Sequence, residues 1–170
     1  MILIIEGPDL SGKTTAIEKI GKFYNRGFTL KNNFKPKNKQ SSEKIYTHYW
    51  RIFKLITHEP FVILDRCFPS QAVYSYLRGT DELRSKDIMM LDKFASRTNC
   101  VYIYLDTNLK ELERRYMDRG DEHISIDDLE RIKTRYDLFY ELTRMKKIRI
   151  NTIKDNWFGE LRTFIEEAQK

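Results

Sequence analysis

A short segment near the start of the chain has the residues of a phosphate-binding loop. In loops of this pattern, G-x-x-x-x-G-K-[ST], backbone N–H groups close around phosphate oxygens, Lys13 would reach the β- and γ-phosphates, and Thr14 would hold Mg²⁺. An ordinary glycine-rich turn does not require a lysine followed by two threonines, Thr14 and Thr15. We therefore predict a nucleotide site, with Lys13 facing solvent when the loop is empty. The pattern is matched by Gly7-Pro8-Asp9-Leu10-Ser11-Gly12-Lys13-Thr14.

A second pair of reactive residues, Asp65 and Arg66, follows the apolar run 61–64. Ligands of open α/β sheets sit beyond the carboxyl ends of the strands, so this pair should face the phosphate loop from a neighbouring strand. The aspartate could hold the hydration shell of Mg²⁺ or orient an attacking oxygen, and the arginine could clamp phosphate oxygens. The alternative is that Asp65 only caps the next helix, although Pro69 and Ser70 could cap that helix themselves.

A third set of charged residues is a group of arginines in the segment 113–122. Arg115 and Arg119 are four residues apart and share one face of a helix, whereas Arg114 points aside. Unpaired like charges on one face repel, so an anion between them would stabilise this end of the helix. A solvated charged face is the alternative, but beside a phosphate loop we favour a mobile arginine lid over residues 114–125.

The elements that must position these residues alternate apolar runs with helical patterns, which is the signature of a parallel α/β sheet. Residues 1–5 form a continuous apolar run, as expected for a strand buried on both faces. Neither a repeat nor a linker divides the chain, so residues 1–170 should form one domain. Further strands are expected at 61–64, 101–105 and 147–151, with a strand remnant and a basic loop between 27 and 42. Helices are expected at 14–24, 43–57, 70–78, 84–97, 108–118, 126–143 and 156–168.

Composition sets further limits on the class of protein. Hydrophobic residues make up 41% of the 170, which suits a single core. No apolar stretch approaches the ~20 residues that span a bilayer, so we expect a cytoplasmic protein without membrane contact. Cys67 and Cys100 fit no metal spacing and should be reduced packing residues. The net charge of +6 favours polyanionic partners but does not separate a nucleotide from a nucleic acid.

Together these motifs resemble those of thymidylate kinases and related deoxynucleoside monophosphate kinases. The resemblance rests on residues 6–15, on Asp65-Arg66-Cys67-Phe68-Pro69-Ser70 and on the arginine lid. It continues through residues 126–136, which look like the helix after the lid, and through the final strand and helix. It is interrupted at about residues 27–50, where this chain is shorter. The resemblance implies an α/β, three-layer P-loop kinase fold with a parallel central sheet flanked by helices, and ATP and Mg²⁺ as cofactors.

The resemblance also implies roles for individual residues. Leu10 stands where some relatives place a catalytic arginine, so this chain looks like the type that draws its arginines from the lid. Arg66 is similar to the arginine that bridges the acceptor and donor phosphates. The implied catalytic residues are Lys13, Asp65, Arg66, Arg115 and Arg119, with Thr14 and Asp65 as metal ligands. The implied ATP-binding residues are Gly7, Asp9, Ser11, Gly12, Lys13, Thr14, Thr15 and Arg114.

The implied acceptor region, about residues 27–57, is shortened. The Arg-Glu-Pro segment that helps hold the acceptor phosphate in many relatives is missing, and Lys35 could replace it as a point charge. One of Tyr46, Tyr49 and Trp50 could stack on the base, although aromatics at helical spacing are more often core. Cys67 replaces the tyrosine usual at its position. The implied acceptor-binding residues are Asp9, Lys35, Trp50, Arg51, Arg66, Ser70 and Tyr74.

The expected reaction is transfer of the γ-phosphoryl group of ATP to a deoxynucleoside monophosphate, giving a diphosphate. The acceptor would be dTMP or a related deoxypyrimidine monophosphate, including 5-modified ones. The nearest alternative is a P-loop kinase acting on a hydroxyl of a nucleoside or of DNA or RNA, with Asp65 as general base and the basic loop 31–39 in an open groove. A GTPase switch would need D-x-x-G and N-K-x-D elements, which are missing. Against a non-catalytic nucleotide sensor stand Lys13, Asp65, Arg66 and the lid arginines, which a binding module alone would not need.

The expected partners are therefore a small-molecule nucleotide and, in the alternative, a nucleic acid at the basic loop. Relatives commonly form dimers through helices beside the acceptor site. A homodimer through the surface of Met89, Met90, Leu91 and Phe94 is accordingly a further expectation.

Overall fold

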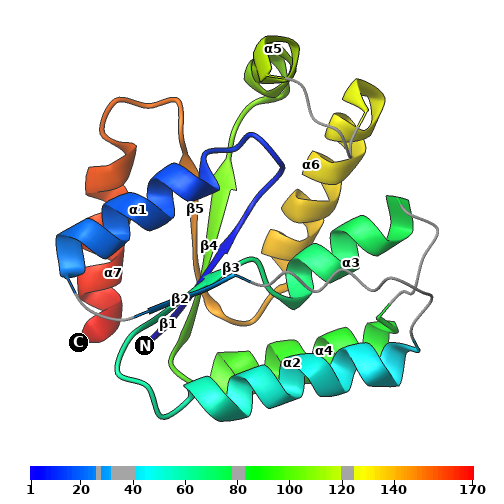
Figure 1. Cartoon of the computed structure of the whole chain (residues 1–170), viewed down its shortest axis with the longest axis vertical. Coiled ribbons are helices and arrows are strands. Elements are labelled where there is room, and N and C mark those ends of the chain that lie inside the picture. The colour runs from blue at the N-terminus through cyan, green and yellow to red at the C-terminus, as the bar shows by residue number, and fades with distance from the viewer. Residues whose placement is uncertain (26–27, 32–40, 78–82, 120–124) are drawn as a thin grey trace.

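A parallel sheet organises the chain, as the alternation of apolar runs and helical patterns predicted (Figure 1). The computed structural model describes residues 1–25, 28–31, 41–77, 83–119 and 125–170. Within these ranges five strands pair in parallel in the order β2-β3-β1-β4-β5. They are β1 (Ile2–Glu6), β2 (Phe28–Lys31), β3 (Val62–Asp65), β4 (Cys100–Asp106) and β5 (Lys146–Asn151). The strand remnant expected after residue 27 is thus the edge strand β2.

The helices lie where their apolar spacing placed them, with each end within two residues of expectation. They are α1 (Lys13–Tyr24), α2 (Ser42–Ile56), α3 (Phe68–Leu77), α4 (Ser85–Arg97), α5 (Leu109–Arg119), α6 (Ile126–Leu142) and α7 (Trp157–Gln169). The start of α3 differs from expectation, because Pro69 and Ser70 lie inside its first turn and do not cap it. Proline is tolerated there since the first N–H groups of a helix have no partner within the helix.

Helices cover both faces of the sheet, which gives three layers (Figure 1). The pleat of β1 sends Leu3 and Ile5 to the face covered by α1 and α7, and Ile2 and Ile4 to the opposite face. The second face is covered by α2, α3, α4 and α6, and it carries the larger apolar cluster. The expectation that the run at the start of the chain is buried on both faces is confirmed, since every residue of β1 is buried.

The functional edge is set by the strand order. From β1 the chain passes first to β2 and β3 on one side, and later to β4 and β5 on the other. Ligands of open parallel sheets bind where the strand order reverses in this way, outside the carboxyl ends of the strands. The loop between β1 and α1, the end of β3 and the β4–α5 connection meet at that edge.

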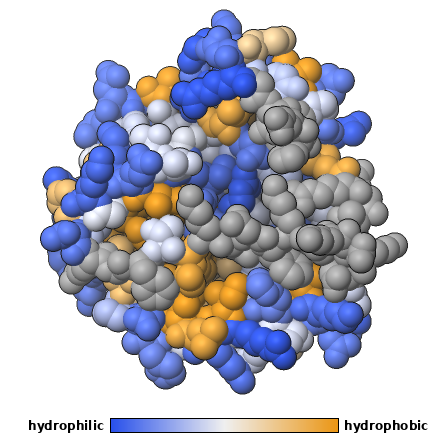
Figure 2. All heavy atoms as spheres, in the orientation of Figure 1, coloured by the Kyte–Doolittle hydropathy of each residue, from blue (hydrophilic) through white to orange (hydrophobic). Residues whose placement is uncertain are grey.

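The expected dimer surface on α4 is only partly exposed. Met89 and Met90 are 62% and 52% exposed, but Leu91 is fully buried. Phe94 packs inward on Trp50 of α2, with ring centroids 4.5 Å apart. Two of the four residues expected on that surface therefore belong to the packing between helices, and the homodimer stays a prediction. In Figure 2, hydrophobic side chains gather at the bottom of the molecule, over the α2 and α4 region, and hydrophilic ones at the top, over α5.

No described helix combines the length and the apolar character that crossing a bilayer requires. Both cysteines are buried and free, as expected for packing residues.

Candidate active site

The phosphate loop depends on backbone conformations that its glycines permit. Gly7 has φ 149°, and a Cβ at this position would lie 2.7 Å from the carbonyl oxygen of Leu105 and from Ser11 Oγ. Gly12, with φ 92°, precedes the first residue of α1. Leu10 also lies in the left-handed region, at φ 66°, which is uncommon for a residue with a side chain. The loop therefore holds a tightly curved shape at the N-terminus of α1, where the helix dipole favours anions.

Lys13 is buried, which corrects the expectation that it faces solvent. Its side chain folds back into the loop, and Nζ donates hydrogen bonds to the carbonyl oxygens of Gly7 at 2.9 Å and Pro8 at 2.5 Å. Burial, together with the nearby positive charge of Arg66, lowers the pKa of Lys13 to about 7. Two carbonyl groups of the loop therefore bind the Lys13 ammonium group. A phosphate oxygen could accept a hydrogen bond from Lys13 only by replacing one of these carbonyl oxygens.

Arg66 is fixed beside the loop by side chains from several elements. It has φ 69°, and its guanidinium forms an ion pair with Asp9. Arg66 Nη1 also donates to Ser70 Oγ at 3.1 Å and to the Tyr136 hydroxyl at 3.0 Å. Asp9 accepts a second hydrogen bond, 2.8 Å long, from the Tyr74 hydroxyl. Burial acts to raise the pKa of Asp9, but the charges of Arg66 and Lys13 outweigh it and the pKa is lowered.

Beneath this pair lies Glu6, a fully buried carboxylate at the end of β1. It accepts hydrogen bonds from the backbone N–H groups of Cys67 at 2.7 Å and Ser70 at 3.3 Å, so it caps the start of α3 from another strand. It also accepts hydrogen bonds from Ser70 Oγ at 2.6 Å and from the Tyr136 hydroxyl at 3.2 Å. The same two hydroxyl groups accept hydrogen bonds from Arg66 Nη1. Burial raises the pKa of Glu6. Sequence reasoning gave no role to Glu6 or Tyr136, because their importance depends on contacts over 130 residues.

The arginines of α5 lie above the loop, and two of the three, Arg114 and Arg115, form ion pairs. The expectation of unpaired charges on Arg115 and Arg119 is therefore corrected for Arg115. Glu111 binds both Arg114 and Arg115 through ion pairs of 2.8 Å, and Asp118 binds Arg114 at 2.6 Å. The pKa of Glu111 is lowered to about 2 by the hydrogen bonds from these arginines. Arg119 makes no ion pair with another described residue, and its side chain is exposed.

These residues surround a cleft of about 680 Å³. Two of its sides matter for the chemistry, and we call them the loop wall and the helix wall. The loop wall contains Asp9, Lys13 and Arg66, and the helix wall contains Arg114, Arg115 and Arg119. The structure thus brings together residues that are more than 100 positions apart in the sequence. The cleft is lined by Asp9, Leu10, Gly12, Lys13, Thr14, Thr15, Asp65, Arg66, Arg114, Arg115, Asp118, Arg119, Thr152 and Trp157.

Other predicted site residues lie beneath the cleft or away from it. Ser70 and Tyr74 are 8% and 6% exposed and support the loop wall from below. Trp50 and Arg51 do not line this cleft: Trp50 is half-buried and packs on Phe94, and Arg51 is exposed on α2, so their role in binding the acceptor stays a prediction. Gly7 and Ser11 shape the loop without lining the cleft, and Lys35 and the basic loop from 32 to 39 lie outside the described residues.

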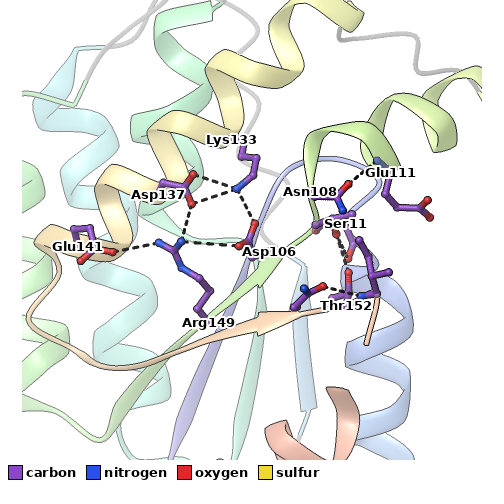
Figure 3. A network of polar contacts seen from close by, with 12 residues as sticks. Ser11, Asp106, Asn108, Glu111, Lys133, Asp137, Glu141, Arg149 and Thr152 are labelled. Atoms are coloured by element: carbon purple, nitrogen blue, oxygen red, sulfur yellow. Dashed lines mark hydrogen bonds and ion pairs between the residues drawn. The ribbon is translucent and has the colours of Figure 1, made fainter. Parts of the chain in front are cut away.

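Two residues of the cleft had no expected role: Thr152, in the connection between β5 and α7, and Trp157, the first residue of α7. Thr152 shares a 2.7 Å hydrogen bond with Thr107, whose hydroxyl also donates to the Ser11 carbonyl at 3.5 Å. This link ties the β5–α7 connection to the phosphate loop (Figure 3). A tryptophan at the start of the last amphipathic helix was the available signal.

A charged network anchors α6 to the same edge of the sheet (Figure 3). Lys133 Nζ lies 2.7 Å from Asp106 at the end of β4 and 3.1 Å from Asp137. Arg149 of β5 reaches Asp137 at 3.3 Å and Glu141 at 3.3 Å. The helix that carries Tyr136 is thereby fixed relative to β4 and β5, which helps to place the hydroxyl that holds Arg66.

The cleft offers oxygen ligands of the kind that Mg²⁺ prefers. The Thr14 side chain is exposed at the N-terminus of α1, and Asp65 is half-buried at the end of β3. Both line the cleft, so the donor set fits a Mg²⁺ ion that retains water or phosphate ligands. Among the described residues, no group of three or more His, Cys, Asp or Glu side chains could by itself hold a metal.

No protein-family model matches the chain. The SPbeta prophage-derived uncharacterized protein YorR of Bacillus subtilis (strain 168) is 28% identical over 137 residues, which are 79% of each chain. The solved structure of YorR from Bacillus subtilis has a TM-score of 0.82 and 21% sequence identity, over 99% of this chain and 98% of that chain.

Solved nucleotide kinases have the same architecture. Deoxyadenosine kinase from M. mycoides has a TM-score of 0.63 and 17% identity, over 98% of this chain and 100% of that chain. Thymidylate kinase from Candida albicans has a TM-score of 0.64 and 16% identity, over 99% of this chain and 92% of that chain. The parallel sheet, its flanking helices and these similarities together show that the chain has a P-loop kinase fold.

Proposed function

We propose that the chain transfers the γ-phosphoryl group of ATP to a deoxynucleoside monophosphate, giving ADP and a deoxynucleoside diphosphate. The acceptor we favour is dTMP or a related deoxypyrimidine monophosphate, including 5-modified ones. The observation that supports this proposal is the cleft itself, where five cationic side chains from three parts of the sequence converge. Phosphoryl transfer requires alignment and neutralisation of phosphate charge more than covalent chemistry, and such a cleft supplies both.

On the donor side, the loop and the N-terminus of α1 would hold the polyphosphate. Thr14 and Asp65 would hold Mg²⁺, which when bound neutralises charge on the phosphate oxygens. Lys13 would exchange its two loop carbonyl groups for phosphate oxygens, which are stronger acceptors because they are charged. Arg114, Arg115 and Arg119 would approach the same phosphates from the helix wall.

On the acceptor side, Arg66 would receive the phosphate of the monophosphate. It lines the cleft between Asp9 and Asp65, and its guanidinium is already oriented by Ser70 and Tyr136. The phosphate of a monophosphate is largely ionised at neutral pH, so it can attack without a strong general base. Glu6 is unsuited to such a role, because it is fully buried and its oxygens already accept hydrogen bonds.

The comparison structures support a nucleotide ligand. YorR was solved in complex with phosphorylated GDP, and the deoxyadenosine kinase was solved with dCMP and dCDP as products. The identity of the base recognised by this chain therefore has to come from experiment. A single domain over residues 1–170, a homodimer and a cytoplasmic location stay predictions.

A hydroxyl acceptor is the second candidate. The fold is shared with a deoxyadenosine kinase, and Asp65 lines the cleft, where a carboxylate could accept the proton of an attacking hydroxyl. In that case Asp65 would act on the acceptor instead of on the metal. The acceptor could then be a nucleoside or, with the basic loop, the end of a nucleic acid.

The deciding experiment measures transfer of labelled γ-phosphate from MgATP to a panel of acceptors. The panel contains deoxynucleoside monophosphates of each base, 5-modified deoxypyrimidine monophosphates, the corresponding nucleosides and short oligonucleotides. We expect a labelled diphosphate from a deoxypyrimidine monophosphate. Label found only in nucleosides or oligonucleotides would establish the hydroxyl kinase instead, and no transfer to any acceptor would favour a nucleotide sensor.

A further inference from the structure

Glu111 joins two arginines of the helix wall in one arrangement. Its Oε1 lies 2.8 Å from Arg115 Nε and 2.8 Å from Arg114 Nη2, and its Oε2 lies 2.8 Å from Arg114 Nε. Glu111 itself is fixed in the first turn of α5, because its backbone N–H donates to Asn108 Oδ1 at 2.8 Å (Figure 3). The backbone from which this carboxylate extends is therefore fixed at the start of the helix.

The two arginines differ in their contacts with other residues. Arg115 Nη1 donates a 2.8 Å hydrogen bond to the carbonyl oxygen of Leu10, so this side chain crosses from α5 to the phosphate loop. Arg114 stays on the surface of α5, where it also binds Asp118. The exposed fractions agree with this difference, since they are 22% for the Arg115 side chain and 61% for that of Arg114.

An ordinary ion pair between residues four apart on a solvated helix face would not explain why Arg115 contacts Leu10. Such ion pairs contribute little to stability and leave both side chains free to move. Here the Glu111 side chain is 21% exposed, and its carboxylate directs the Arg115 guanidinium toward a loop residue 105 positions away. Leu10 contributes to this geometry through its left-handed backbone, with φ 66°.

We propose that Glu111 is a positioning residue that docks Arg115 onto the phosphate loop. The effect on catalysis rests on the proposed phosphoryl transfer, whereas the docking itself is a property of the protein without ligand. Docking places the guanidinium over the loop before the donor binds, so that its orientation is not established anew in each turnover. Arg115 Nη1 can then exchange the Leu10 carbonyl for a charged phosphate oxygen, while Glu111 continues to hold Nε.

The charge of Glu111 gives the proposal a distinctive kinetic signature. The negative charge of Glu111 behind the helix wall opposes the binding of phosphates, so its removal should not weaken donor binding. Loss of the orientation of Arg115 should instead slow the chemical step. We therefore expect Glu111→Ala to lower kcat about tenfold or more while KM for ATP stays constant or falls.

Double-mutant cycles identify the partner through which Glu111 acts. Glu111→Ala in an Arg115→Ala background should cause no further loss of kcat, because the side chain to be positioned is gone. In an Arg114→Ala background the full loss should remain. Asp118→Ala removes a carboxylate that binds Arg114 alone, so it should leave the docking of Arg115 on the loop intact.

Glu113→Ala is the matched control on the same helix. It makes the same substitution two residues away, and Glu113 makes no ion pair with another described residue. A loss of kcat that appears equally in Glu113→Ala would reflect helix stability and would overturn the proposal. Glu111→Gln, which keeps the shape of the side chain without its charge, guards against a failure of Glu111→Ala to fold.

Docking can also be measured without any activity, from the Nε–H resonances of arginine side chains in the ligand-free protein. In wild type the Arg115 Nε–H, assigned through Arg115→Lys, should exchange slowly with water. That protection should be lost in Glu111→Ala and kept in Glu113→Ala and Asp118→Ala. Fast exchange in wild type would refute the docking even if transfer is observed, and slow exchange in a protein without transfer would uphold the docking while refuting the proposed function.

Discussion

The two walls of the cleft hold their cations in different ways. On the loop wall, Arg66 is bound by Asp9, Ser70 and Tyr136, and the latter two rest on the buried Glu6. These partners come from the phosphate loop, α3, α6 and β1. On the helix wall, the partners of Arg114 are Glu111 and Asp118, both on α5 itself.

The number of elements that hold each cation determines how easily it can move. Moving Arg66 would break contacts between several elements and leave buried polar groups without partners, which is expensive. Moving Arg114 exchanges one surface ion pair for another or for water. We infer that the loop wall, with Arg115 docked on it, is a fixed template and that the exposed Arg114 and Arg119 adapt to the ligand.

The largest effect should come from Lys13→Met, which keeps most of the aliphatic side chain and removes the charge. We expect transfer to fall about 10²- to 10³-fold or more, since a donor to the reacting phosphates is lost. Steady-state transfer with a saturating acceptor measures this. The matched control is Lys22→Met, which changes an exposed lysine in the last turn of the same helix. Full activity of Lys13→Met would contradict the role of the loop.

Arg66→Ala should destabilise the folded protein by about 2–3 kcal/mol, because Asp9 and the hydroxyl groups below lose their shared partner. Arg119→Ala should change stability by no more than about 0.5 kcal/mol, as is usual for an exposed side chain. Urea unfolding monitored by circular dichroism measures both free energies of unfolding. Equal values for the two variants would remove the contrast between the walls.

Arg119→Ala should still affect the reaction. We expect kcat to fall about tenfold or more, while the dissociation constant for ATP changes less than about threefold, if this arginine acts mainly on the transition state. Arg97→Ala is the matched control, since Arg97 is the exposed arginine in the last turn of α4. A loss confined to ATP affinity would make Arg119 a passive binding group.

A smaller effect should appear in the pH dependence of ATP binding. Because the pKa of Lys13 is about 7 without ligand, the lysine is charged below that pH and increasingly neutral above it. Phosphate binds the charged form, so the dissociation constant should rise about fivefold from pH 7 to pH 8. Titration calorimetry across this range measures the change. In Lys13→Arg the side chain stays charged at both pH values, so this rise of the dissociation constant should disappear. If the rise is unchanged in that variant, the titrating group is another residue.

The sequence predicted most of the fold because each signal was local. The buried strand before Gly7 and the helix after Lys13 follow from apolar spacing, and all predicted strands and helices were found close to their expected bounds. The loop wall was also predicted, since Asp65 and Arg66 directly end a strand. What could not be predicted depended on contacts between distant segments, such as the bond of Tyr136 to Glu6.

The expectations for α5, for Trp50 and for Lys13 also depended on contacts that the sequence does not show. The charge pattern of α5 suggested repelling arginines, but the pattern does not say that Glu111 and Asp118 turn toward them. Trp50 lies at a helical spacing that fits a ligand site or a core equally well, and the sequence does not show that Phe94 approaches it from another helix. The lysine of the loop was expected in solvent because carbonyl groups that bind a cation leave no trace in sequence.

The place of Trp157 gives the molecule an optical reporter. The chain contains two tryptophans, and Trp50 is packed against Phe94, whereas Trp157 lines the cleft with Lys19 5.2 Å from its ring. A nucleotide that enters beside Trp157 changes the surroundings of that indole alone. In a Trp50→Phe variant, intrinsic fluorescence should then follow occupancy of the cleft in real time, without a label and before any phosphate is transferred.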